Sequence, residues 1–360
     1  MIEVTVGVIA RNEEKHIAKL LRSLLNLNFP KDKYEIILVD GDSSDATLRI
    51  AKQVLSEGNV RYRIIEEGKE AIKRIVEQKI VDEETARNLR FKLNYYGPCF
   101  ARNLVIEHSD KHAKYIAFID ADCIADRDWL KILYERIKNA SKDIAGVGGL
   151  RLIAKTNNRM ELLINSILTS CIATLGNPAF CRKDTRYVES IPNYNAIYRK
   201  DILEREKYDV DLVISDDVEL NYRLRRKGYK FLYEPDAKVY HHETSSVKEF
   251  LRNMFRYGVN VARVVRKHKR VVRIYVPFSL FFVFSPVLSL ICLYLGLACL
   301  PAIFYGLYFI IVFLVFAEIL IKTKDSLRAL LVFILLPSQH FAYGLGVLKG
   351  LFFDSFIRKD

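Results

Sequence analysis

The sequence predicts an α/β domain with a mostly parallel sheet, followed by an α-helical transmembrane region. Three observations lead to this fold class. Short apolar runs alternate with helix-like segments through the first two thirds of the 360 residues, which is the pattern of βαβ units. Acidic residues stand directly after several of these runs. Beyond residue 273 the chain changes to long apolar segments with few charges.

The first 40 residues predict a strand, a helix and a second strand. "EVTVGVI" and "YEIILV" are apolar runs of the length of buried strands. Between them, apolar residues recur at the spacing of one helical face; they are Ile17, Leu20, Leu21, Leu24 and Leu25. A helix between two neighbouring strands favours parallel pairing.

The second strand ends in "DGDSSDAT", which places Asp40 at its carboxyl end, beside a turn and the start of another helix. "RYRIIEE" predicts a third strand. Residues 68–96 predict one or two charged helices, to which we assign no role. No Gly-x-Gly-x-x-Gly follows the first strand and no Walker pattern occurs, which disfavours a dinucleotide oxidoreductase and a P-loop NTPase.

An acid pair follows the next strand, in "YIAFIDADCIADRDWL". Ligands bind beyond the carboxyl ends of such strands, and Asp120 and Asp122 point the same way in an extended chain. Two carboxylates so placed suit Mg²⁺ or Mn²⁺. Asp-x-Asp is a short pattern that occurs four times in this chain, so a solvated turn is an equal alternative from this stretch alone.

The C-terminal region predicts about three transmembrane helices. "IYVPFSLFFVFSPVLSLICLYLG" and "PAIFYGLYFIIVFLVFAEILI" are each long enough to span a bilayer. A third segment, "ALLVFILLPSQHFAYGLGVLKGLFF", contains Gln339 and His340, whose polar groups need a partner within the protein. A re-entrant third segment therefore stays an alternative to a full span.

A basic cluster precedes the first span and accounts for much of the net charge of +13. It contains no acid and eight basic residues: Arg252, Arg256, Arg263, Arg266, Lys267, Lys269, Arg270 and Arg273. Such a cluster predicts an interfacial helix lying on anionic lipid. Nucleic acid is disfavoured as a partner because no nucleic-acid module is recognisable. The predicted domains are residues 1–245, the interfacial region 246–272 and the transmembrane region 273–360.

Charge and cysteine usage predict the location of the α/β domain. Met1 leads into the first strand without a signal-peptide pattern, and the loop "KTKDSLR" between the second and third spans is basic. We therefore expect the loop and the domain on the cytoplasmic side of a cell membrane. The six cysteines show no Cys-x-x-Cys spacing, which favours reduced, structural thiols.

Seven motifs occur in order: "VTVGVIARNEEKHIAKLLRSLL", "EIILVDGDSSDAT", "GPCFARN", "YIAFIDADCIADRDWL", "YNAIYRKDILE", "SDDVELNYRLRRKGYKFLYEPDAKVYH" and "FLRNMFRYG". Together they resemble the family 2 inverting glycosyltransferases of GT-A fold. The resemblance is greatest to the membrane-bound, succinoglycan-type glucosyltransferases that build lipid-linked polysaccharides. It covers residues 4 to 260.

The resemblance implies a set of site residues. A nucleoside-diphosphate sugar would be held by Ala10, Arg11, Glu13, Asp40, Arg102, Asp120, Arg256 and Tyr257. A divalent metal, Mg²⁺ or Mn²⁺, would be bound by Asp122, with His241 at the family's Val-x-His position; His242 is the alternative for a one-residue shift. Tyr257 stands where processive relatives have Trp, which argues against processive polymerisation.

Catalysis of sugar transfer requires a neutralised leaving diphosphate and a base for the acceptor hydroxyl. The resemblance places Asp217 at the catalytic base, with Asp216 as the alternative. A second reading of "SDDVEL" is a helix N-terminus capped by Ser215, and both roles can coexist.

The expected function is metal-dependent, inverting transfer of a sugar to a lipid-linked acceptor at the cytoplasmic membrane face. A polyprenyl-phosphate glycosyl synthase, whose acceptor phosphate needs no base, is the alternative within the enzyme class. A catalytically silent, membrane-anchored protein that binds glycans or nucleotide sugars is the alternative outside it. The sugar, the nucleotide and the oligomeric state are not specified by these patterns.

Overall fold

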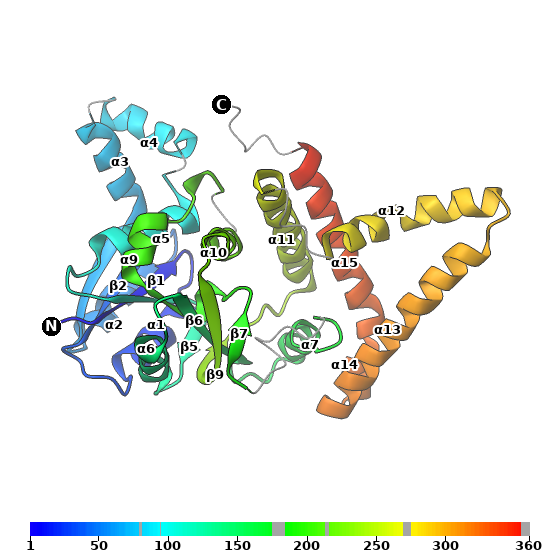
Figure 1. Cartoon of the computed structure of the whole chain (residues 1–360), viewed down its shortest axis with the longest axis horizontal. Coiled ribbons are helices and arrows are strands. Elements are labelled where there is room, and N and C mark those ends of the chain that lie inside the picture. Colours follow the sequence, from blue (N-terminus) through cyan, green and yellow to red (C-terminus); the bar gives the residue numbers. More distant parts are fainter. Residues whose placement is uncertain (79–80, 94, 175–183, 213–215, 269–274, 354–360) are drawn as a thin grey trace. The chain divides into compact units, whose positions relative to one another are not determined.

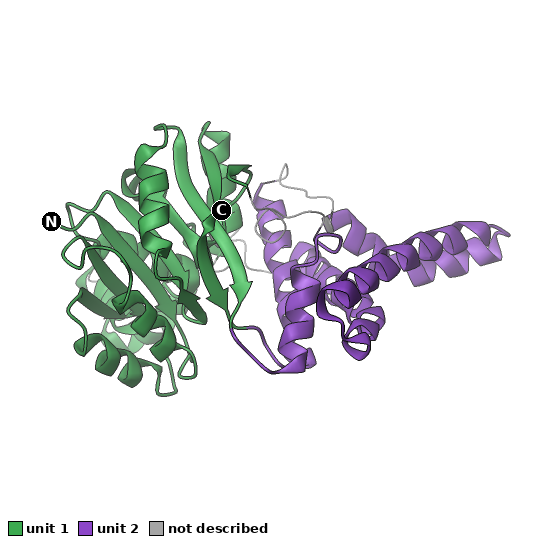
Figure 2. Cartoon of the chain, turned by 90° about the horizontal axis from the view of Figure 1, so that it is seen from below, with its two compact units in different colours: residues 1–154, 183–242 green, residues 155–182, 243–360 purple. Residues whose placement is uncertain are grey.

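The chain forms two compact units, shown in different colours in Figure 2: residues 1–154 with 183–242, and residues 155–182 with 243–360. Residues 155–182 thus group with the second unit, although they lie within the stretch that the sequence pattern assigns to the α/β domain. The computed structural model describes residues 1–78, 81–93, 95–174, 184–212, 216–268 and 275–353.

The first unit contains a mixed sheet of order β3-β2-β1-β4-β8-β6-β9-β5, with β7 paired to β9. The four strands β3, β2, β1 and β4 are parallel neighbours, as the βαβ pattern predicts. The other half is mixed, because β8 runs antiparallel to both β4 and β6 while β9 is parallel only to β6. The strands are β1 (Val4–Ala10), β2 (Tyr34–Asp40), β3 (Arg61–Glu66), β4 (Tyr115–Asp120), β5 (Cys123–Ala125), β6 (Ile144–Ile153), β7 (Arg186–Val188), β8 (Ala196–Arg199) and β9 (Lys230–His241).

Helices cover both faces of this sheet (Figure 1). One face packs against α1, α2 and α6, and the other against α5, α9 and α10. The α-helices of the first unit are α1 (Ile17–Leu25), α2 (Thr47–Ser56), α3 (Glu67–Glu77), α4 (Glu83–Lys92), α5 (Gly97–His108), α6 (Trp129–Asn139), α9 (Lys200–Glu206) and α10 (Asp216–Arg226).

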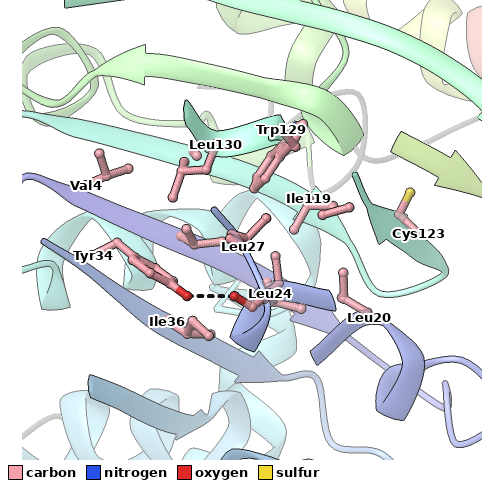
Figure 3. Close-up of a cluster of buried hydrophobic side chains, with 14 of the residues drawn as sticks. Val4, Leu20, Leu24, Leu27, Tyr34, Ile36, Ile119, Cys123, Trp129 and Leu130 are labelled. Atoms are coloured by element: carbon pink, nitrogen blue, oxygen red, sulfur yellow. Dashed lines mark hydrogen bonds between the residues drawn. The ribbon is translucent and has the colours of Figure 1, made fainter. Parts of the chain in front are cut away.

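The larger core lies under α1 and α6 and is shown in Figure 3. Leu20 and Leu24 of α1 are fully buried against the strands, as the helical spacing predicts. The hydroxyl of the fully buried Tyr34 donates to the Leu24 carbonyl oxygen at 2.7 Å. The indole of Trp129 donates to Asn195 Oδ1 at 2.8 Å, which satisfies its buried N–H.

The opposite face brings α5 very close to β1. A Cβ atom at Gly7 would lie 2.7 Å from Val105 Cγ1 and 2.8 Å from the Phe118 ring. Glycine at this position therefore permits the helix carrying the "FARN" residues to lie directly on the strands.

The described part of the second unit is α-helical and contains three helices long and apolar enough to cross a membrane: Val276–Tyr294, Cys299–Thr323 and Ser326–Phe353. They correspond to the three predicted segments. The helices are α7 (Arg159–Leu168), α11 (Val247–Lys267), α12 (Tyr275–Tyr294), α13 (Cys299–Thr323), α14 (Ser326–Leu330) and α15 (Val332–Leu348), with a π-helical turn at Lys349–Phe353.

The basic helix α11 packs along α15 through glycines. A Cβ atom at Gly258 would collide with the Tyr343 carbonyl oxygen, and one at Gly346 with the Phe255 carbonyl oxygen. At its N-terminus, Ser246 Oγ accepts from the Glu249 N–H at 3.3 Å, as a helix cap. The predicted amphipathic helix therefore has its apolar side on a candidate membrane span.

Two polar side chains of the candidate spans, His340 and Glu318, have partners within the protein. His340 Nδ1 and the Tyr308 hydroxyl are 2.8 Å apart, which meets the requirement noted for His340. The buried Gln339 Oε1 has no hydrogen-bond partner among the described residues. Glu318 of α13 accepts from the Cys171 N–H at 3.1 Å and so ties the residues after α7 to a candidate span.

Cys171 is disulfide-bonded, which corrects the prediction that all cysteines are reduced. Its bonding partner lies outside the described residues. Cys99, Cys123, Cys292 and Cys299 are free thiols.

Candidate active site

The predicted nucleotide-binding residues of β1, β2 and β4 converge at one edge of the sheet. In the parallel register Ala10 pairs with Asp40, and Ile9 pairs with Asp120. All three strands therefore end together, and the loops that carry Arg11, Glu13 and Asp122 begin from that edge. Ligands of open α/β sheets bind beyond such carboxyl ends.

The loops after β1 and β2 are joined by hydrogen bonds. Asn12 has φ 57°, and its Oδ1 accepts from the Ser44 N–H at 2.8 Å. Its own N–H donates to Ser43 Oγ at 3.0 Å. The Glu13 N–H donates to Thr47 Oγ1 at 2.7 Å. These bonds hold the two loops in one arrangement.

Asp40 is 2% exposed. Its Oδ2 accepts from the Ser43 N–H at 3.1 Å, whereas its Oδ1 is buried and has no hydrogen-bond partner among the described residues. A buried acceptor left unpaired is costly, so a ligand donor such as a ribose hydroxyl or a base N–H would complete the carboxylate.

Asp120 forms an ion pair with Arg102 of α5, with Nη2 and Oδ1 3.2 Å apart. The guanidinium also lies over the Phe118 and Tyr208 rings, at 5.7 and 5.8 Å from their centroids. Although 39% of the Asp120 side chain remains exposed, the surrounding protein raises its pKa by displacing water, with Arg102 opposing the shift. The pair leaves the carboxylate accessible to a ligand.

Strand pairing far along the chain brings His241 to Asp122. Cys123 of β5 pairs with His241 of β9, and the His242 N–H donates to the Asp122 carbonyl oxygen at 3.0 Å. His241 Nε2 lies 3.4 Å from Asp122 Oδ1. The ligand atoms of Asp122, Cys123 and His241 lie within 4.8 Å of one another.

The chemistry of this pair fits a divalent cation. Burial lowers the pKa of His241 to about 3, so the imidazole is neutral at pH 7. Its Nδ1 lies 2.6 Å from the His242 carbonyl oxygen, which only accepts, so this contact places the proton on Nδ1 and leaves Nε2 as a lone-pair donor facing Asp122. Burial raises the pKa of Asp122 to about 6, so its carboxylate is mainly ionised at pH 7.

Cys123 is a poorer ligand than its neighbours. Its side chain is 1% exposed and belongs to the core beneath the site (Figure 3). Burial raises the pKa of the thiol well above its usual value, so it remains protonated, whereas metal ligation needs the thiolate. Asp122 and His241 therefore make up the candidate metal pair.

Arg151 and Tyr194 also belong to this site, although sequence reasoning did not identify them. Arg151 Nη2 is 3.4 Å from His241 Nδ1, and its guanidinium lies 5.9 Å from the Tyr194 ring centroid. The Tyr194 ring is 5.8 Å from that of His241. Tyr194 begins the motif "YNAIYRKDILE", but no local pattern places it or Arg151 beside His241, because Arg151 comes from β6 and Tyr194 from the turn before β8.

Asp217 lies in the first turn of α10, with its Oδ1 accepting from the Val218 N–H at 2.7 Å. Burial chiefly raises the pKa of Tyr194, and the charges of Asp217 and Asp120 add to the shift. Both carboxylates thus lie near enough to Tyr194 to raise its pKa. The side chain of Asp216, and Ser215 with its predicted cap, lie outside the described part of the chain.

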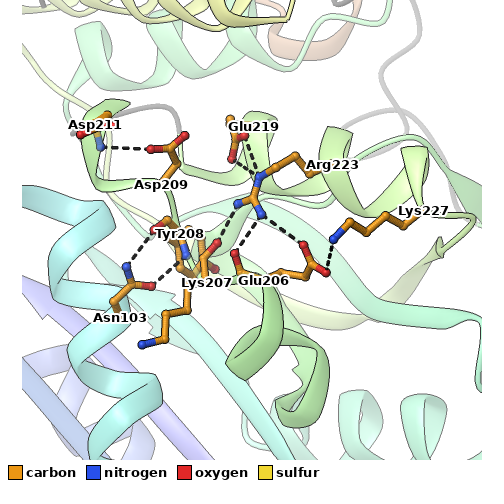
Figure 4. Close-up of polar contacts among 9 residues, drawn as sticks. All are labelled: Asn103, Glu206, Lys207, Tyr208, Asp209, Asp211, Glu219, Arg223 and Lys227. Carbon is orange, nitrogen blue, oxygen red and sulfur yellow. Dashed lines mark hydrogen bonds and ion pairs between the residues drawn. The ribbon is translucent and has the colours of Figure 1, made fainter. Parts of the chain in front are cut away.

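A polar network fixes the segment that leads into α10 (Figure 4). Asn103, next to Arg102, donates to the Tyr208 carbonyl oxygen and accepts from its N–H, both at 2.8 Å. Arg223 of α10 binds Glu219 at 2.7 Å and the Glu206 carbonyl oxygen at 2.9 Å. The sequence reasoning missed Asn103 and Arg223, which connect α5 to the helix that carries Asp217.

Arg256 and Tyr257 lie on α11 in the second unit, and both are exposed. Their predicted contact with a nucleotide sugar remains a prediction. Of the two neighbouring histidines, His241 faces Asp122, while the His242 ring centroid lies 4.4 Å from that of His16, with the ring planes tilted by 33°.

Comparison with protein families identifies two matching models. The model described as glycosyl transferase family 2 matches residues 5–207, more than half of the chain. The model described as glycosyl transferase family group 2 matches residues 115–321.

Known proteins similar to this chain include two archaeal transferases and one solved structure. A dolichyl N-acetyl-α-D-glucosaminyl phosphate 3-β-D-2,3-diacetamido-2,3-dideoxy-β-D-glucuronosyltransferase from Methanococcus voltae is 26% identical over 94% of each chain. Glycosyltransferase AglE from Haloferax volcanii is 26% identical over 71% of each chain. The fold resembles that of a mannosyltransferase from Pyrobaculum calidifontis, solved with GDP-mannose and Mn²⁺, with a TM-score of 0.56 at 16% identity over 97% of this chain and 87% of that one.

Proposed function

The chain belongs to glycosyl transferase family 2 and is a glycosyltransferase, and on that premise we propose that it is a metal-dependent, inverting enzyme. It transfers one sugar from a nucleoside-diphosphate sugar to a lipid-linked acceptor at the cytoplasmic face of a membrane. The observation that carries the proposal is the convergence of Asp40, Asp120, Asp122 and His241 at the carboxyl edge of the sheet.

The nucleoside occupies the loops after β1 and β2. The unpaired Oδ1 of Asp40 accepts a hydrogen bond from its ribose or base. Ala10 ends the neighbouring strand, and Arg11 and Glu13 follow in the loop that is bonded to the loop of Asp40. Asp120 belongs to β4, which pairs with β1 on the side opposite to β2. Its carboxylate is held by Arg102 and faces the ribose.

Asp122 and His241 would hold a divalent cation, Mg²⁺ or Mn²⁺, through a carboxylate oxygen and a neutral imidazole nitrogen. When bound, such a cation supplies Lewis-acid neutralisation of the departing diphosphate. Arg102 is a fixed cation beside Asp120 and adds to the neutralisation of the diphosphate. Arg256 of α11 is a further candidate for this role. A mannosyltransferase of similar fold was solved with GDP-mannose and Mn²⁺, which supports the choice of a divalent cation.

Asp217 takes the proton of the acceptor hydroxyl. The acceptor oxygen forms a bond to the anomeric carbon as the bond from that carbon to the diphosphate oxygen breaks, and attack from the opposite face inverts the configuration. The nucleoside diphosphate leaves with the electron pair, and the proton remains on the carboxylate. Asp216 adjoins Asp217 in sequence and is the alternative base.

The acceptor is carried on a lipid. The relative from Methanococcus voltae, which aligns along 94% of each chain, is named for a dolichyl phosphate-linked sugar acceptor. Three helices able to span a membrane and a basic α11 follow the catalytic unit. We place the enzyme among transferases that assemble lipid-linked polysaccharides, with the basic cluster on anionic lipid.

The proposal is tested with the full chain in nanodiscs. A panel of nucleotide sugars is screened by thermal shift with and without Mn²⁺, and the stabilising sugars are then assayed for transfer to a membrane lipid extract. We expect one or a few donors to stabilise the protein in the presence of Mn²⁺ and to label a lipid fraction. Donor binding without transfer to any lipid would favour the silent binding protein, and transfer unaffected by EDTA would exclude metal dependence.

A further inference from the structure

The helical pair α3–α4 has no assigned role in the mechanism above. Figure 1 shows it projecting from the sheet beside the ends of β2 and β3. Its first residue, Glu67, directly follows Glu66, which pairs in register with Asp40. The pair of helices therefore starts next to the carboxylate that we assign to the nucleoside.

The turn after Asp40 has a conformation that needs support. Asp42 has φ 57°, in the left-handed region, which aspartate tolerates better than most residues but which still requires fixing by its surroundings. The Ser43 N–H, one residue further on, is the group that binds Asp40 Oδ2. The geometry at Asp42 therefore determines how the Asp40 carboxylate is oriented.

The support comes from α3 and α4. Arg90 Nη2 lies 2.5 Å from Asp42 Oδ2, and the Gly68 N–H donates to Asp42 Oδ1 at 3.2 Å. A Cβ atom at Gly68 would collide with the Arg90 guanidinium and with the Asp42 carboxylate, so glycine allows both groups to lie against the backbone of α3. The Arg90 side chain is only 14% exposed, which strengthens its attraction to Asp42.

Glu67 fixes the base of the helical pair. It is 4% exposed, and its Oε1 accepts from the N–H of Gly97, the first residue of α5. Its Oε2 lies so near Gly41 that a Cβ atom there would be 3.1 Å away. Both ends of the pair thus adjoin the turn between Asp40 and Ser43.

We propose that α3–α4 is the element that shapes the nucleoside site, with Arg90 as a positioning residue that holds Asp42, and through it Asp40, for binding of the donor's nucleoside. The inference rests on the proposed function, since it assumes a nucleoside diphosphate at Asp40. Arg90 acts on donor binding and leaves the chemical step at Asp122 and Asp217 unchanged.

The experiment measures dissociation constants of UDP, GDP and dTDP with Mn²⁺ for the full chain, together with KM and kcat for the active donor. For Arg90→Ala we expect the nucleotide Kd and the donor KM to rise about tenfold, with kcat within twofold of the parent. Arg87→Ala is the matched control, because Arg87 is an exposed arginine on the same helix, and it should change neither constant.

A second variant separates positioning from general loss of structure. Asp42→Asn keeps a residue that tolerates positive φ and removes the charge that Arg90 binds. It should also raise Kd about tenfold, and adding Arg90→Ala to it should cause little further loss. Melting temperatures establish that each variant is folded.

The outcomes distinguish the inference from the function. Unchanged Kd and KM in folded Arg90→Ala, or independent additive losses in the double variant, would overturn the role of Arg90 while leaving the proposed function intact. A parent protein that binds no nucleoside diphosphate would overturn both.

Discussion

At the scale of single residues, the candidate metal pair depends on the protonation state of one imidazole. Two causes keep Nε2 of His241 available: burial lowers the pKa to about 3, and the carbonyl oxygen of His242 fixes the proton on Nδ1. A charged imidazole beside Asp122 would form a simple ion pair. A neutral one leaves the negative charge of Asp122 available for a cation.

Replacing Asp122 by Asn tests this pair. Because the amide is a weaker metal ligand without charge, turnover should fall by roughly 10²–10³-fold, the scale of Lewis-acid stabilisation. The Mn²⁺-dependent part of the nucleotide affinity should disappear as well. Asp128→Asn, in a second Asp-x-Asp triplet whose carboxylate binds Asn28, serves as the control. Full activity of Asp122→Asn in the presence of EDTA would show that Asp122 does not act in catalysis as a metal ligand.

Glu67 provides a second prediction, through the pH dependence of stability. Burial chiefly raises its pKa to about 7 and the charge of Asp42 adds to the shift, while the Gly97 N–H, Arg90 and Arg11 oppose it. The ordinary pKa of 4.5 applies in the unfolded chain. Between pH 4.5 and about 7, Glu67 is mainly protonated in the folded protein and mainly ionised in the unfolded chain. The free energy of unfolding therefore decreases as the pH rises from about 4.5 to about 7.

Glu67→Gln should remove that contribution, which amounts to about 3 kcal/mol at most. Melting temperatures of the parent and the variant, measured from pH 4.5 to 8, should show a flatter profile for the variant. Glu83→Gln, at an exposed position of α4, should retain the parent's slope. A Glu67→Gln profile parallel to the parent's would show that Glu67 titrates normally.

At the scale of elements, the helix that carries Asp217 is connected to α5 by Asn103. The amide of Asn103 satisfies both the N–H and the carbonyl oxygen of Tyr208, and Arg223 fastens α10 to the carbonyl oxygens of Glu206 and Lys207 (Figure 4). The "FARN" motif thus contributes Arg102 to the nucleotide side and Asn103 to the support of the proposed base.

Asn103→Ala should leave two buried backbone groups of Tyr208 unsatisfied, at a cost of roughly 1–3 kcal/mol for each group. We expect a lower melting temperature and a decrease in kcat that exceeds any change in donor Kd, because the change loosens α10. Asn139→Ala, at an exposed helix end, is the control. An unchanged melting temperature would show that the two hydrogen bonds contribute little.

Elements differ in how far the sequence determines them locally. The strands and helices of the first 66 residues follow apolar periodicity, and the three apolar helices follow length and composition. Asp40 and Asp120 could be expected to meet because parallel strands end at one edge. The β5–β9 pairing that carries His241, and the contacts of Arg151 and Tyr194, depend on register between distant segments, so His241 was predicted only from the family resemblance.

At the scale of the whole molecule, the sequence predicts an α/β catalytic unit and a membrane region, but not that residues 155–182 group with the unit that contains the three candidate spans. Within the second unit α7 packs against α13 and α14, and Glu318 binds the residues after it. These contacts join segments separated by more than 140 residues, which local patterns do not reveal. The site assignments for Arg256 and Tyr257 stay predictions.

The basic face of α11 leads to a prediction about the membrane. Reversing Arg263 and Lys267 to Glu should lower transfer to lipid acceptors in anionic vesicles, since each basic charge near such a surface is worth about 1 kcal/mol. Arg266 is left unchanged because it donates to the Gly350 carbonyl oxygen at 3.2 Å. Donor hydrolysis should change little, and Lys142→Glu on the catalytic unit is the control. Equal losses of both activities would indicate misfolding.

The central claim is that Asp217 deprotonates a sugar hydroxyl on a lipid-linked acceptor, and the most direct test is the turnover of Asp217→Asn on two acceptors. With a lipid-linked sugar, turnover should fall roughly 10²–10⁴-fold while donor binding stays unchanged, because general-base catalysis is lost. Polyprenyl phosphate, an oxyanion at pH 7 that needs no base, should not be a substrate of the parent or of the variant. Near-normal turnover of Asp217→Asn with polyprenyl phosphate would contradict the claim and identify the protein as a polyprenyl-phosphate glycosyl synthase.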